Sequence, residues 1–538
     1  MSRVALEACW PAGSTAHRVS LSERAGPAQI GRRSSTLSTA RSSVPTTPSG
    51  STFFGHPRGL STLFFTEMWE RASYYGMRAL LILYMTAAIT EGNPGMGLDV
   101  ATAGAIYGLY TGMVYLLALP GGWVADNIWG QRKAVFVGGC IIAAGHFCLA
   151  VPSTATFYTG LILIVIGTGL LKPNVSTMVG ELYPEGGARR DAGFSMFYMG
   201  INVGAIIGPT ITSMLGENYN WHWGFSAAGV GMVFGLIQYK MGVRHLGTAG
   251  LLQTTDAPET VARKARTFFA GVAVVGLLTA AFAWLVAAGT LPFTLTQIAA
   301  GLGTGILVLA IGYFVYLIGF AGHSGEEKKR LLVIFWLFLL AAVFWSGFEQ
   351  GGSSLNLFAS DLTDRTVFGW EMPAGWLQNV NPIMIVVLAP VFGWLWVWLA
   401  RRNANPSIPV KFGLGLLGLA VGFLVLSWGA ANATPETPVS MSWLVVTYFF
   451  HTCGELALSP VGLSSITKLS PAGRVGQMMG VWFVAASLGN VFAGLVAGTL
   501  ESMAPFALFR TVAMIIGGVG LFALLMSPAV KKLMGKVE

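Results

Sequence analysis

Charged residues are scarce in this chain of 538 residues. Asp, Glu, Lys and Arg together make up 10% of the sequence, whereas 54% of the residues are hydrophobic and the mean hydropathy is +0.64. That balance excludes a string of soluble domains and is typical of an integral membrane protein. The net charge of +9 does not indicate a nucleic-acid partner, because most Lys and Arg residues stand in short connections between apolar runs.

Cysteines and catalytic signatures are also few. The four cysteines are scattered, and Cys140, Cys148 and Cys453 lie in apolar runs, which fits neither a disulfide framework nor a metal site. The sequence has no HExxH or GxSxG motif, and HTCGE at residues 451–455 is not a zinc-binding helix. We therefore expect no cofactor, and a membrane-embedded enzyme is disfavoured.

Residues 1–58 differ from the rest of the chain. They are rich in Ser, Thr, Pro and Arg, and they contain no apolar run long enough for a signal-peptide core. The segment is predicted to be a disordered cytoplasmic tail. A gene start placed too far upstream explains the same composition, and a basic, Ser-rich targeting segment is the alternative.

Apolar runs of about 20 residues, the length that crosses a bilayer, recur through the remainder of the chain. We identify fourteen, at residues 59–90, 101–124, 133–152, 156–179, 191–214, 222–242, 267–289, 295–320, 331–358, 376–400, 411–431, 441–467, 475–499 and 505–527. The sequence thus predicts an all-α integral membrane protein with fourteen transmembrane helices.

Basic residues flank alternate connections between these runs. They are Arg132, Lys133, Arg189, Arg190, Arg263, Lys264, Arg266, Lys328, Lys329, Arg330, Arg401, Arg402, Lys468, Arg474, Lys531 and Lys532. By the positive-inside rule these connections face the cytoplasm, so both termini are expected to be cytoplasmic. The opposite connections are acidic, with Arg365 as the exception.

The seventh and eighth runs contain no intramembrane charge and look like an insertion between two halves of six helices each. We expect an N-terminal bundle at 59–242, a linker with two inserted helices at 243–330, a C-terminal bundle at 331–528 and a basic cytoplasmic tail at 529–538.

One apolar run contains a stripe of polar side chains. If residues 67–78 are helical, these side chains share one continuous face: Glu67, Glu70, Arg71, Tyr74, Tyr75 and Arg78. A charge at the centre of a membrane helix costs about 2.5 to 3.5 kcal/mol on insertion scales, so the stripe is predicted to face a bundle interior or a water-filled cavity. An interfacial aromatic belt is the alternative for the two tyrosines.

Other intramembrane polar residues are few enough to name: Lys172, Asn202, Glu349, Gln350, Gln378, Asn381 and Glu455. The buried charges nearly balance, which indicates mutual pairing. Lys172 is alternatively a residue that snorkels to the membrane surface, and Glu455 is alternatively only its structural partner. His451 is interpreted as a single hydrogen-bonded histidine rather than as a proton site.

Carboxylates beside Arg or Lys in such a bundle can exchange their partner for a proton. Protonation of Glu67 or Glu349 would free a base to bind a substrate carboxylate, which is the physical basis of proton-coupled transport. Bases such as Arg71 and Lys172 opposite Glu455 would suit a zwitterionic ligand.

Three motifs resemble those of a known family, and a fourth resembles that of a wider superfamily. EMWERASYYG at residues 67–76 resembles the ExxERFxYYG signature of the proton-coupled oligopeptide transporters. GTGLLKPNVSTMVGELY (167–183) and FYMGINVGAIIGP (197–209) resemble that family's other two signatures. GGWVADNIWGQRK (121–133) is similar to the loop motif of the major facilitator superfamily, although Asn127 stands where that motif usually has Arg.

The resemblance implies the major facilitator fold, with two six-helix bundles that alternate between inward and outward states and two extra helices as in bacterial members. It implies a proton-coupling set of Glu67, Glu70, Arg71, Lys172, Arg78, Glu349 and Glu455. It implies a substrate-binding set of Arg71, Tyr74, Tyr75, Tyr115, Lys172, Asn202, Trp345, Asn381, Glu455, Trp482, Phe483 and Ser487.

Within these sets the resemblance assigns roles. Arg71 and Lys172 would receive the carboxylate of a peptide, Lys172 would also be able to pair with Glu455, and Arg78 would pair with Glu349. Ala72 departs from the family pattern, which usually has Phe, and this puts the shape of the site in question. No second-span histidine is present beside Tyr115, so coupling should depend on carboxylates.

The expected function is a secondary transporter, not an enzyme, that imports di- and tripeptides by proton symport. The expected partners are peptides, peptidomimetic drugs, protons and the lipid bilayer, and the chain is expected to act as a monomer in the inner (plasma) membrane. The same fold carrying amino acids, nitrate or other small solutes is the alternative. A channel or receptor is disfavoured, because acid–base pairs spread over both halves are typical of gates that exchange partners.

Overall fold

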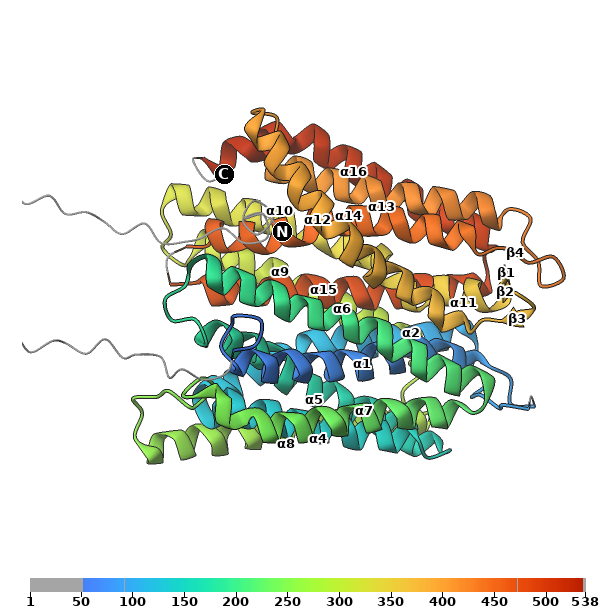
Figure 1. The fold of residues 1–538 in the computed structure, drawn as a ribbon, viewed down its shortest axis with the longest axis horizontal. Coiled ribbons are helices and arrows are strands. Elements are labelled where there is room, and N and C mark those ends of the chain that lie inside the picture. Colours follow the sequence, from blue (N-terminus) through green and yellow to red (C-terminus); the bar gives the residue numbers. More distant parts are fainter. Residues whose placement is uncertain (1–51, 91, 472, 536–538) are drawn as a thin grey trace, which may run out of the picture.

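The computed structural model describes residues 52–90, 92–471 and 473–535. In this part of the chain fourteen long helical segments lie side by side along one direction (Figure 1). Twelve are long and apolar enough to cross a membrane. The other two are α1 (Gly59–Thr86), whose hydropathy is lowered by four charged residues, and α7 (Trp221–Gly242). All fourteen correspond to the predicted runs.

The N half of the molecule comprises α1 to α7. Between α1 and α7 its elements are α2 (Val100–Leu116), α3 (Ala118–Val124), the π-helical turn η1 (Ala125–Trp129), α4 (Gln131–Leu149), α5 (Thr154–Glu181) and α6 (Gly187–Asn218). Because α2, α3 and η1 follow one another without a break, they form a single span of 30 residues. A short 3-10 turn, η2 (Val243–Leu246), closes this half.

The C half comprises α10 to α16. Its helices are α10 (Gly325–Phe348), η3 (Glu349–Gly352), α11 (Ser354–Asp361), η4 (Ala374–Asn379), α12 (Val380–Arg401), α13 (Ile408–Ala430), α14 (Ser442–Leu469), α15 (Val475–Gly498), η5 (Thr499–Glu501) and α16 (Pro505–Met534). Since α16 continues to Met534, the predicted tail at 529–538 is helical over its first six residues.

Four two-residue strands lie in the connections at one end of the C half. Strand β1 (Thr363–Asp364) pairs in parallel with β4 (Val439–Ser440), with Thr363 opposite Val439. Strands β2 (Thr366–Val367) and β3 (Trp370–Glu371) form an antiparallel hairpin. Figure 1 shows the four strands beside α11, at the right-hand end of the view.

The two predicted inserted helices are α8 (Pro258–Ala287) and α9 (Leu295–Gly319), and they lie at the periphery. None of the residues of α8 is buried, and the helix is held to the N half by stacking of Phe268 on Trp123, with ring centroids 5.1 Å apart, and by a hydrogen bond from Lys264 to Asn127. Helix α9 packs on α15, where Gly303 faces Val491. Asn127, which departs from the loop motif, therefore serves as an anchor for α8.

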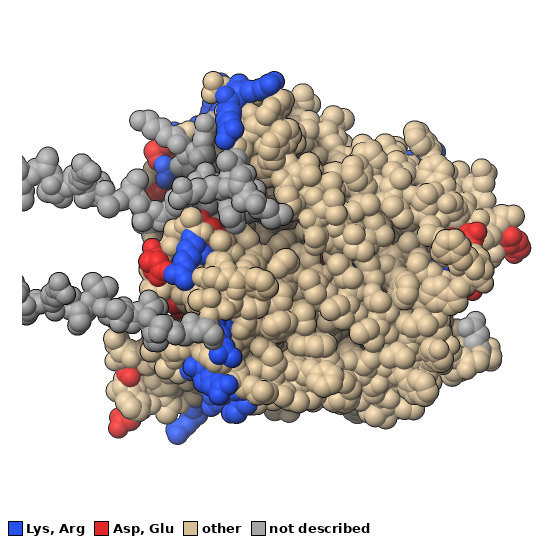
Figure 2. All heavy atoms as spheres, viewed as in Figure 1, with Lys and Arg blue, Asp and Glu red and all other residues tan. Residues whose placement is uncertain are grey.

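Lys and Arg residues gather at one end of the molecule, whereas the flank of the helices is almost free of charge (Figure 2). We call this end the basic end; it carries the connections that contain Arg189 and Arg402, both exposed. The strands lie at the opposite end. An apolar belt between two charged ends is the surface expected of a membrane-spanning bundle.

The segment before α1 was predicted to be a disordered tail, and residues 1–51 of it lie outside the described residues. Residues 52–58 are folded against the N half. Phe53 and His56 form an isolated β-bridge, and Nδ1 of His56 lies 2.8 Å from the hydroxyl of Tyr183. The prediction is therefore wrong for these seven residues.

Small residues let α6 pack closely on α1. A Cβ atom added to Gly204 would lie 3.0 Å from the backbone nitrogen of Ala72. A Cβ atom added to Gly208 would lie 2.9 Å from the Cα atom of Ala72. Thr212 continues the contact by donating a hydrogen bond to the carbonyl of Gly76 (2.8 Å). This backbone approach fixes the rotation of α1 and hence the direction of its polar stripe.

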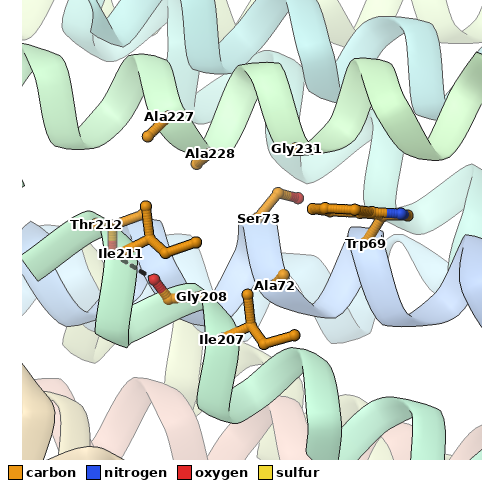
Figure 3. A pocket seen from close by; sticks show the side chains of 10 residues that line it. All are labelled: Trp69, Ala72, Ser73, Ile207, Gly208, Ile211, Thr212, Ala227, Ala228 and Gly231. Atoms are coloured by element: carbon orange, nitrogen blue, oxygen red, sulfur yellow. Dashed lines mark hydrogen bonds between the residues drawn. The ribbon is translucent and has the colours of Figure 1, made fainter.

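Behind α1, on the side away from its charged stripe, is a small apolar pocket of about 30 Å³ (Figure 3). It is lined by Trp69, Ala72, Ser73, Ile207, Gly208, Ile211, Thr212, Ala227, Ala228 and Gly231. The side chain of Ala72 points into this pocket, where the family signature usually has Phe. The space left by the missing ring therefore lies beside Ala72, on the far side of α1 from the charged stripe.

Filling this pocket is expected to stabilise the protein. Ala72→Val should add about 0.5 to 2 kcal/mol to the free energy of unfolding and raise the melting temperature in detergent by about 1 to 3 °C, because apolar atoms would occupy empty space. Ala79→Val is the matched control: Ala79 is fully buried on the same helix without a pocket, so this change should lower the melting temperature. Equal effects of the two substitutions would contradict the prediction.

Candidate functional site

A cavity of about 250 Å³ lies between the two halves. The N half contributes Glu67, Arg71, Tyr75, Arg78, Tyr115, Lys172, Tyr198, Ile201, Asn202, Ala205 and Pro209. The C half contributes Trp345, Phe348, Glu349, Gly351, Gln378, Asn381, Pro382, Ile385, Tyr448, His451 and Glu455. Eleven of the residues predicted from the sequence therefore line one cavity, although they come from seven separate helical segments.

The α1 stripe divides into a cavity face and a rear face. Glu67 and Arg71 line the cavity, whereas Glu70 is fully buried behind them. The guanidinium of Arg71 is bound by both carboxylate oxygens of Glu70, with Nη2 2.6 Å from Oε1, and its Nε lies 3.4 Å from Oε1 of Glu67. The other carboxylate oxygen of Glu67, Oε2, has no hydrogen-bond partner.

Aromatic rings surround the cations of the N half. The guanidinium of Arg71 lies 5.0 Å from the ring centroid of Tyr74 and 5.7 Å from that of Tyr75. The ammonium of Lys172 lies 4.0 Å from the ring centroid of Tyr115. These cation–π contacts hold the positive groups in place without neutralising them.

Arg78 and Glu349 join the two halves. Nη1 of Arg78 donates to Oε2 of Glu349 at 2.7 Å, and both side chains are nearly buried. Glu349 stands where the helix of the C half breaks: α10 ends at Phe348, a 3-10 turn follows, and the backbone at Ser353 leaves the helical region with ψ −96°. The break brings the carboxylate to the end of a helix that faces the cavity. The predicted pairing is present.

Lys172 points into the cavity from α5, one residue before Pro173. It does not snorkel to a membrane surface. Across the cavity on α14, Glu455 accepts a hydrogen bond from Nδ2 of Asn381 at 3.1 Å, and the same amide donates to Thr452 at 3.0 Å. Among the ion pairs of the described residues none joins Lys172 to Glu455. The expected contact between them is absent in this conformation.

Some of the charges at the cavity are held in ion pairs, and two are not. Arg78 is paired with Glu349, and Arg71 is held by Glu70. An ammonium on α5 and a carboxylate on α14 remain on opposite walls, without an oppositely charged partner among the ion pairs of the described residues. Two separated, opposite charges match a ligand that carries both an amino and a carboxylate group.

Five predicted residues do not line the cavity in this conformation: Glu70, Tyr74, Trp482, Phe483 and Ser487. Ser487 is fully buried and donates to the carbonyl of Gly112 at 2.8 Å, which joins α15 to α2. Trp482 packs against Phe412 and Gly462 within the C half. The resemblance implies these residues on α1 and α15, but not which face of each helix reaches the cavity.

Other lining residues were not predicted as site residues. Tyr448 is one of them, and its hydroxyl donates to the carbonyl of Gly351 at 3.3 Å. Tyr448, His451 and Glu455 follow one another at intervals of three and four residues, so the helical period around Glu455 would have indicated them. Nε2 of His451 has no hydrogen-bond partner, so the expectation of a fully hydrogen-bonded histidine is wrong for this atom.

The two halves are also joined at the end away from the basic connections. The carboxylate of Glu217, in the last turn of α6, accepts hydrogen bonds from the backbone nitrogens of Ala374 (2.6 Å) and Gly375 (3.0 Å) at the start of η4. Nε1 of Trp376 donates to the carbonyl of Thr210 at 2.9 Å. These contacts fasten the N half to the C half.

Loss of the Glu217 carboxylate is expected to loosen this junction between the halves and to open the cavity more often toward that end. Glu217→Ala would leave two backbone N–H groups unpaired and should lower the free energy of unfolding by about 1 to 3 kcal/mol. In a background without native cysteines, a cysteine at Ile385 should also react faster with a membrane-impermeant thiol reagent applied from that end.

Glu436→Ala is the control for this experiment, because Glu436 is an exposed carboxylate in a connection at the same end. Reaction rates that are the same in the two variants would contradict a gating role for Glu217.

Within the described ranges no group of three His, Cys, Asp or Glu side chains is placed to hold a metal ion. The cavity lining itself presents charged and titratable side chains, which can bind charged groups and exchange protons and ion-pair partners.

Comparisons with known proteins agree on one family. A sequence profile described as the POT family matches residues 132–528. The peptide transporter YePEPT of Yersinia enterocolitica subsp. palearctica serotype O:3 (strain YE-P4) is 44% identical over 466 residues, which cover 85% of this chain and 90% of that protein. A di-/tripeptide transporter of Lactococcus lactis subsp. lactis (strain IL1403) is 39% identical over 498 residues, covering 90% and 98%.

Solved structures show the same arrangement. A crystal structure of a peptide transporter POT in complex with sulfate has a TM-score of 0.82 and 40% identity, and it covers 90% of this chain and 97% of that chain. A POT family transporter in complex with 5-aminolevulinic acid has a TM-score of 0.81 and 34% identity, covering 89% and 98%. The similarity thus extends over most of this chain and nearly all of each solved chain.

Proposed function

The chain belongs to the POT family, the proton-coupled oligopeptide transporters of the major facilitator superfamily, and we propose that it imports di- and tripeptides by proton symport through the cavity between its halves. It is a multi-pass membrane transporter and not an enzyme. The observation that carries the cargo assignment is the separation of Lys172 and Glu455 on opposite walls.

In this proposal the peptide lies across the cavity. Its carboxylate binds Arg71 and Lys172, and its amino group binds Glu455, supported by Asn202 and Asn381. A free peptide carries one charge at each end whatever its sequence, so this pairing recognises every small peptide alike. Hydrogen bonds to charged groups stabilise by about 1.5 to 3 kcal/mol each, enough to dominate the affinity.

The cavity wall between the charged groups receives the side chains of the peptide. Tyr75, Tyr115 and Trp345 supply aromatic surface there. We propose that Trp482, Phe483 and Ser487, which lie behind the wall in this conformation, contact the peptide only after the halves move.

Two carboxylates couple proton binding to movement in this proposal. Protonation of Glu349 ends its ion pair with Arg78 and removes a link between the halves. Protonation of Glu67 removes its charge beside Arg71 and leaves the guanidinium free for the peptide carboxylate. Glu70, which holds Arg71 from the rear, completes the coupling set.

We further propose that the basic end faces the cytoplasm, as the positive-inside rule requires. Both termini then lie in the cytoplasm. The contacts of Glu217 act in this proposal as a gate that closes the cavity toward the outside, and the present conformation faces inward. The protein acts as a monomer in the inner (plasma) membrane, without a cofactor or nucleic-acid partner.

A smaller zwitterion is the second candidate cargo. A similar solved transporter binds 5-aminolevulinic acid, and another binds alafosfalin. Both observations concern other proteins, but the opposite charges in this cavity suit such ligands too. Amino acids and peptide-like drugs are therefore tested beside peptides; nitrate, which has no positive group, gains nothing from Glu455.

Uptake of labelled dialanine into proteoliposomes that are acidic outside tests the proposal. Accumulation should saturate with peptide concentration and should be reduced by unlabelled di- and tripeptides more than by alanine or nitrate. If single amino acids competed as strongly as dipeptides, the cargo would be assigned as amino acids instead of peptides. Uptake that does not saturate would indicate a channel.

A further inference from the structure

Three buried tyrosines lie behind the cavity wall. Tyr74 on α1 and Tyr107 and Tyr110 on α2 are 2%, 0% and 4% exposed, and none of them lines the cavity. The rings of Tyr74 and Tyr110 are stacked with centroids 6.3 Å apart, and Tyr107 stands one helical turn before Tyr110 on α2. We call these three residues the tyrosine seam.

None of the three phenol hydroxyls has a hydrogen-bond partner among the described atoms. Buried hydroxyls are rarely left unpaired, and unpaired groups that lie together are the usual positions of bound water. Tyr75, the neighbour of Tyr74, instead lines the cavity. The three phenols of the seam therefore form a buried polar zone that is not part of the cavity lining.

One end of the seam is at the ion pair that joins the two halves. A Cβ atom at Gly352 would collide with the hydroxyl of Tyr107 and lie 3.1 Å from Nε of Arg78, so this hydroxyl and this nitrogen meet at the helix break. Nε of Arg78 also lacks a partner. The charged or titratable groups that act on Tyr107 are Arg78, Glu349, Tyr74 and Tyr448.

The other end of the seam is at the rear of the α1 stripe. The groups that act on Tyr110 are Tyr74, Glu70, Tyr107 and Arg71. Glu70 lies off the cavity, and both of its carboxylate oxygens are bound to Arg71. The seam thus extends from the Arg78–Glu349 pair to the Glu70–Arg71 pair.

We propose that the tyrosine seam binds ordered water and carries protons from Glu349 to Glu70 without passing through the peptide cavity. This inference rests on the proposed function, because it needs proton-coupled transport. It adds a site for water, and it adds two residues, Tyr107 and Tyr110, that lie outside every signature motif.

The transfer balances without a further reactant. A proton leaves the carboxyl group of Glu349; each water or phenol along the seam accepts one proton and passes one on; and the proton ends on a carboxylate oxygen of Glu70. The phenols remain neutral. Glu349 regains its charge and its ion pair with Arg78, while protonated Glu70 releases Arg71 to bind the peptide carboxylate.

The test compares Tyr110→Phe and the double variant Tyr107→Phe/Tyr110→Phe with the wild-type protein in proteoliposomes. Both variants should keep dialanine counterflow, which needs no net proton movement, within about twofold of wild type. The double variant should lose about tenfold in proton-driven accumulation and in peptide-induced acidification of the lumen. Tyr84→Phe, which removes a buried phenol of α1 outside the seam, should change neither activity.

Unchanged driven accumulation in the double variant would overturn the seam as a proton route. Equal loss of counterflow and driven accumulation would overturn it as well, because that pattern indicates a role in folding or peptide binding. If the wild-type protein itself showed counterflow but no proton-driven accumulation, the proposed proton symport would fail, and the seam's role would fail with it.

Discussion

Replacing Glu67 with Gln is expected to abolish proton-driven accumulation of peptide while exchange of labelled for unlabelled peptide remains measurable. Gln has the shape of protonated Glu but cannot take up or release a proton. Oε2 of Glu67 is the carboxylate oxygen in the α1 stripe that has no partner, and its Oε1 lies 3.4 Å from Arg71. Driven accumulation should fall by about tenfold or more, because cycling requires both charge states.

Glu181→Gln is the matched control for this prediction. Glu181 is a carboxylate at the basic end of α5, where it accepts a hydrogen bond from the backbone nitrogen of Gly250, and it does not line the cavity. This variant should keep driven accumulation. Wild-type accumulation by Glu67→Gln would remove Glu67 from the coupling set.

Removing the charged side chain from one wall of the cavity is expected to weaken binding of the peptide terminus that this wall receives. Lys172→Gln and Glu455→Gln should each raise the concentration of dialanine for half-maximal counterflow by about 10- to 150-fold, because each loses a charged hydrogen bond of about 1.5 to 3 kcal/mol. The cost should be larger for Glu455→Gln, because Arg71 remains beside Lys172 to bind the carboxylate.

Blocked peptides distinguish the two walls. The wild-type protein should reject both N-acetyl-dialanine and dialanine amide. Glu455→Gln should lose its discrimination against the acetylated peptide only, and Lys172→Gln should lose discrimination against the amide only. If both variants weakened both blocked peptides equally, the assignment of one peptide terminus to each wall would be contradicted.

Helical periodicity predicted the polar face of α1 but not its division. Tyr74 and Tyr75 are adjacent in the sequence and 100° apart on a helix, so both could be assigned to one broad stripe. The close approach of Gly204 and Gly208 to Ala72 sets the rotation of α1, and that rotation puts Tyr75 into the cavity and Tyr74 into the seam. Such rotations depend on packing between helices, which one sequence does not specify.

The same limit applies to the C half. Glu349 and Glu455 could be recognised as site residues, because a carboxylate in an apolar run is costly to insert into a membrane and usually has a function. Ser487 could not be placed, because its hydrogen bond to Gly112 depends on how α15 crosses α2 in this conformation. Ala72 is the opposite case: its departure from the signature was visible, but its consequence, a pocket on the far side of α1, was not.

The most direct test of the account measures proton movement with peptide movement. Proteoliposomes that contain a pH-sensitive dye, with equal pH on both sides and a potassium diffusion potential that is negative inside, should acidify when dialanine is added outside. The acidification should saturate with peptide concentration and be absent with Glu67→Gln. Entry of labelled dialanine without any acidification of the lumen would contradict proton symport.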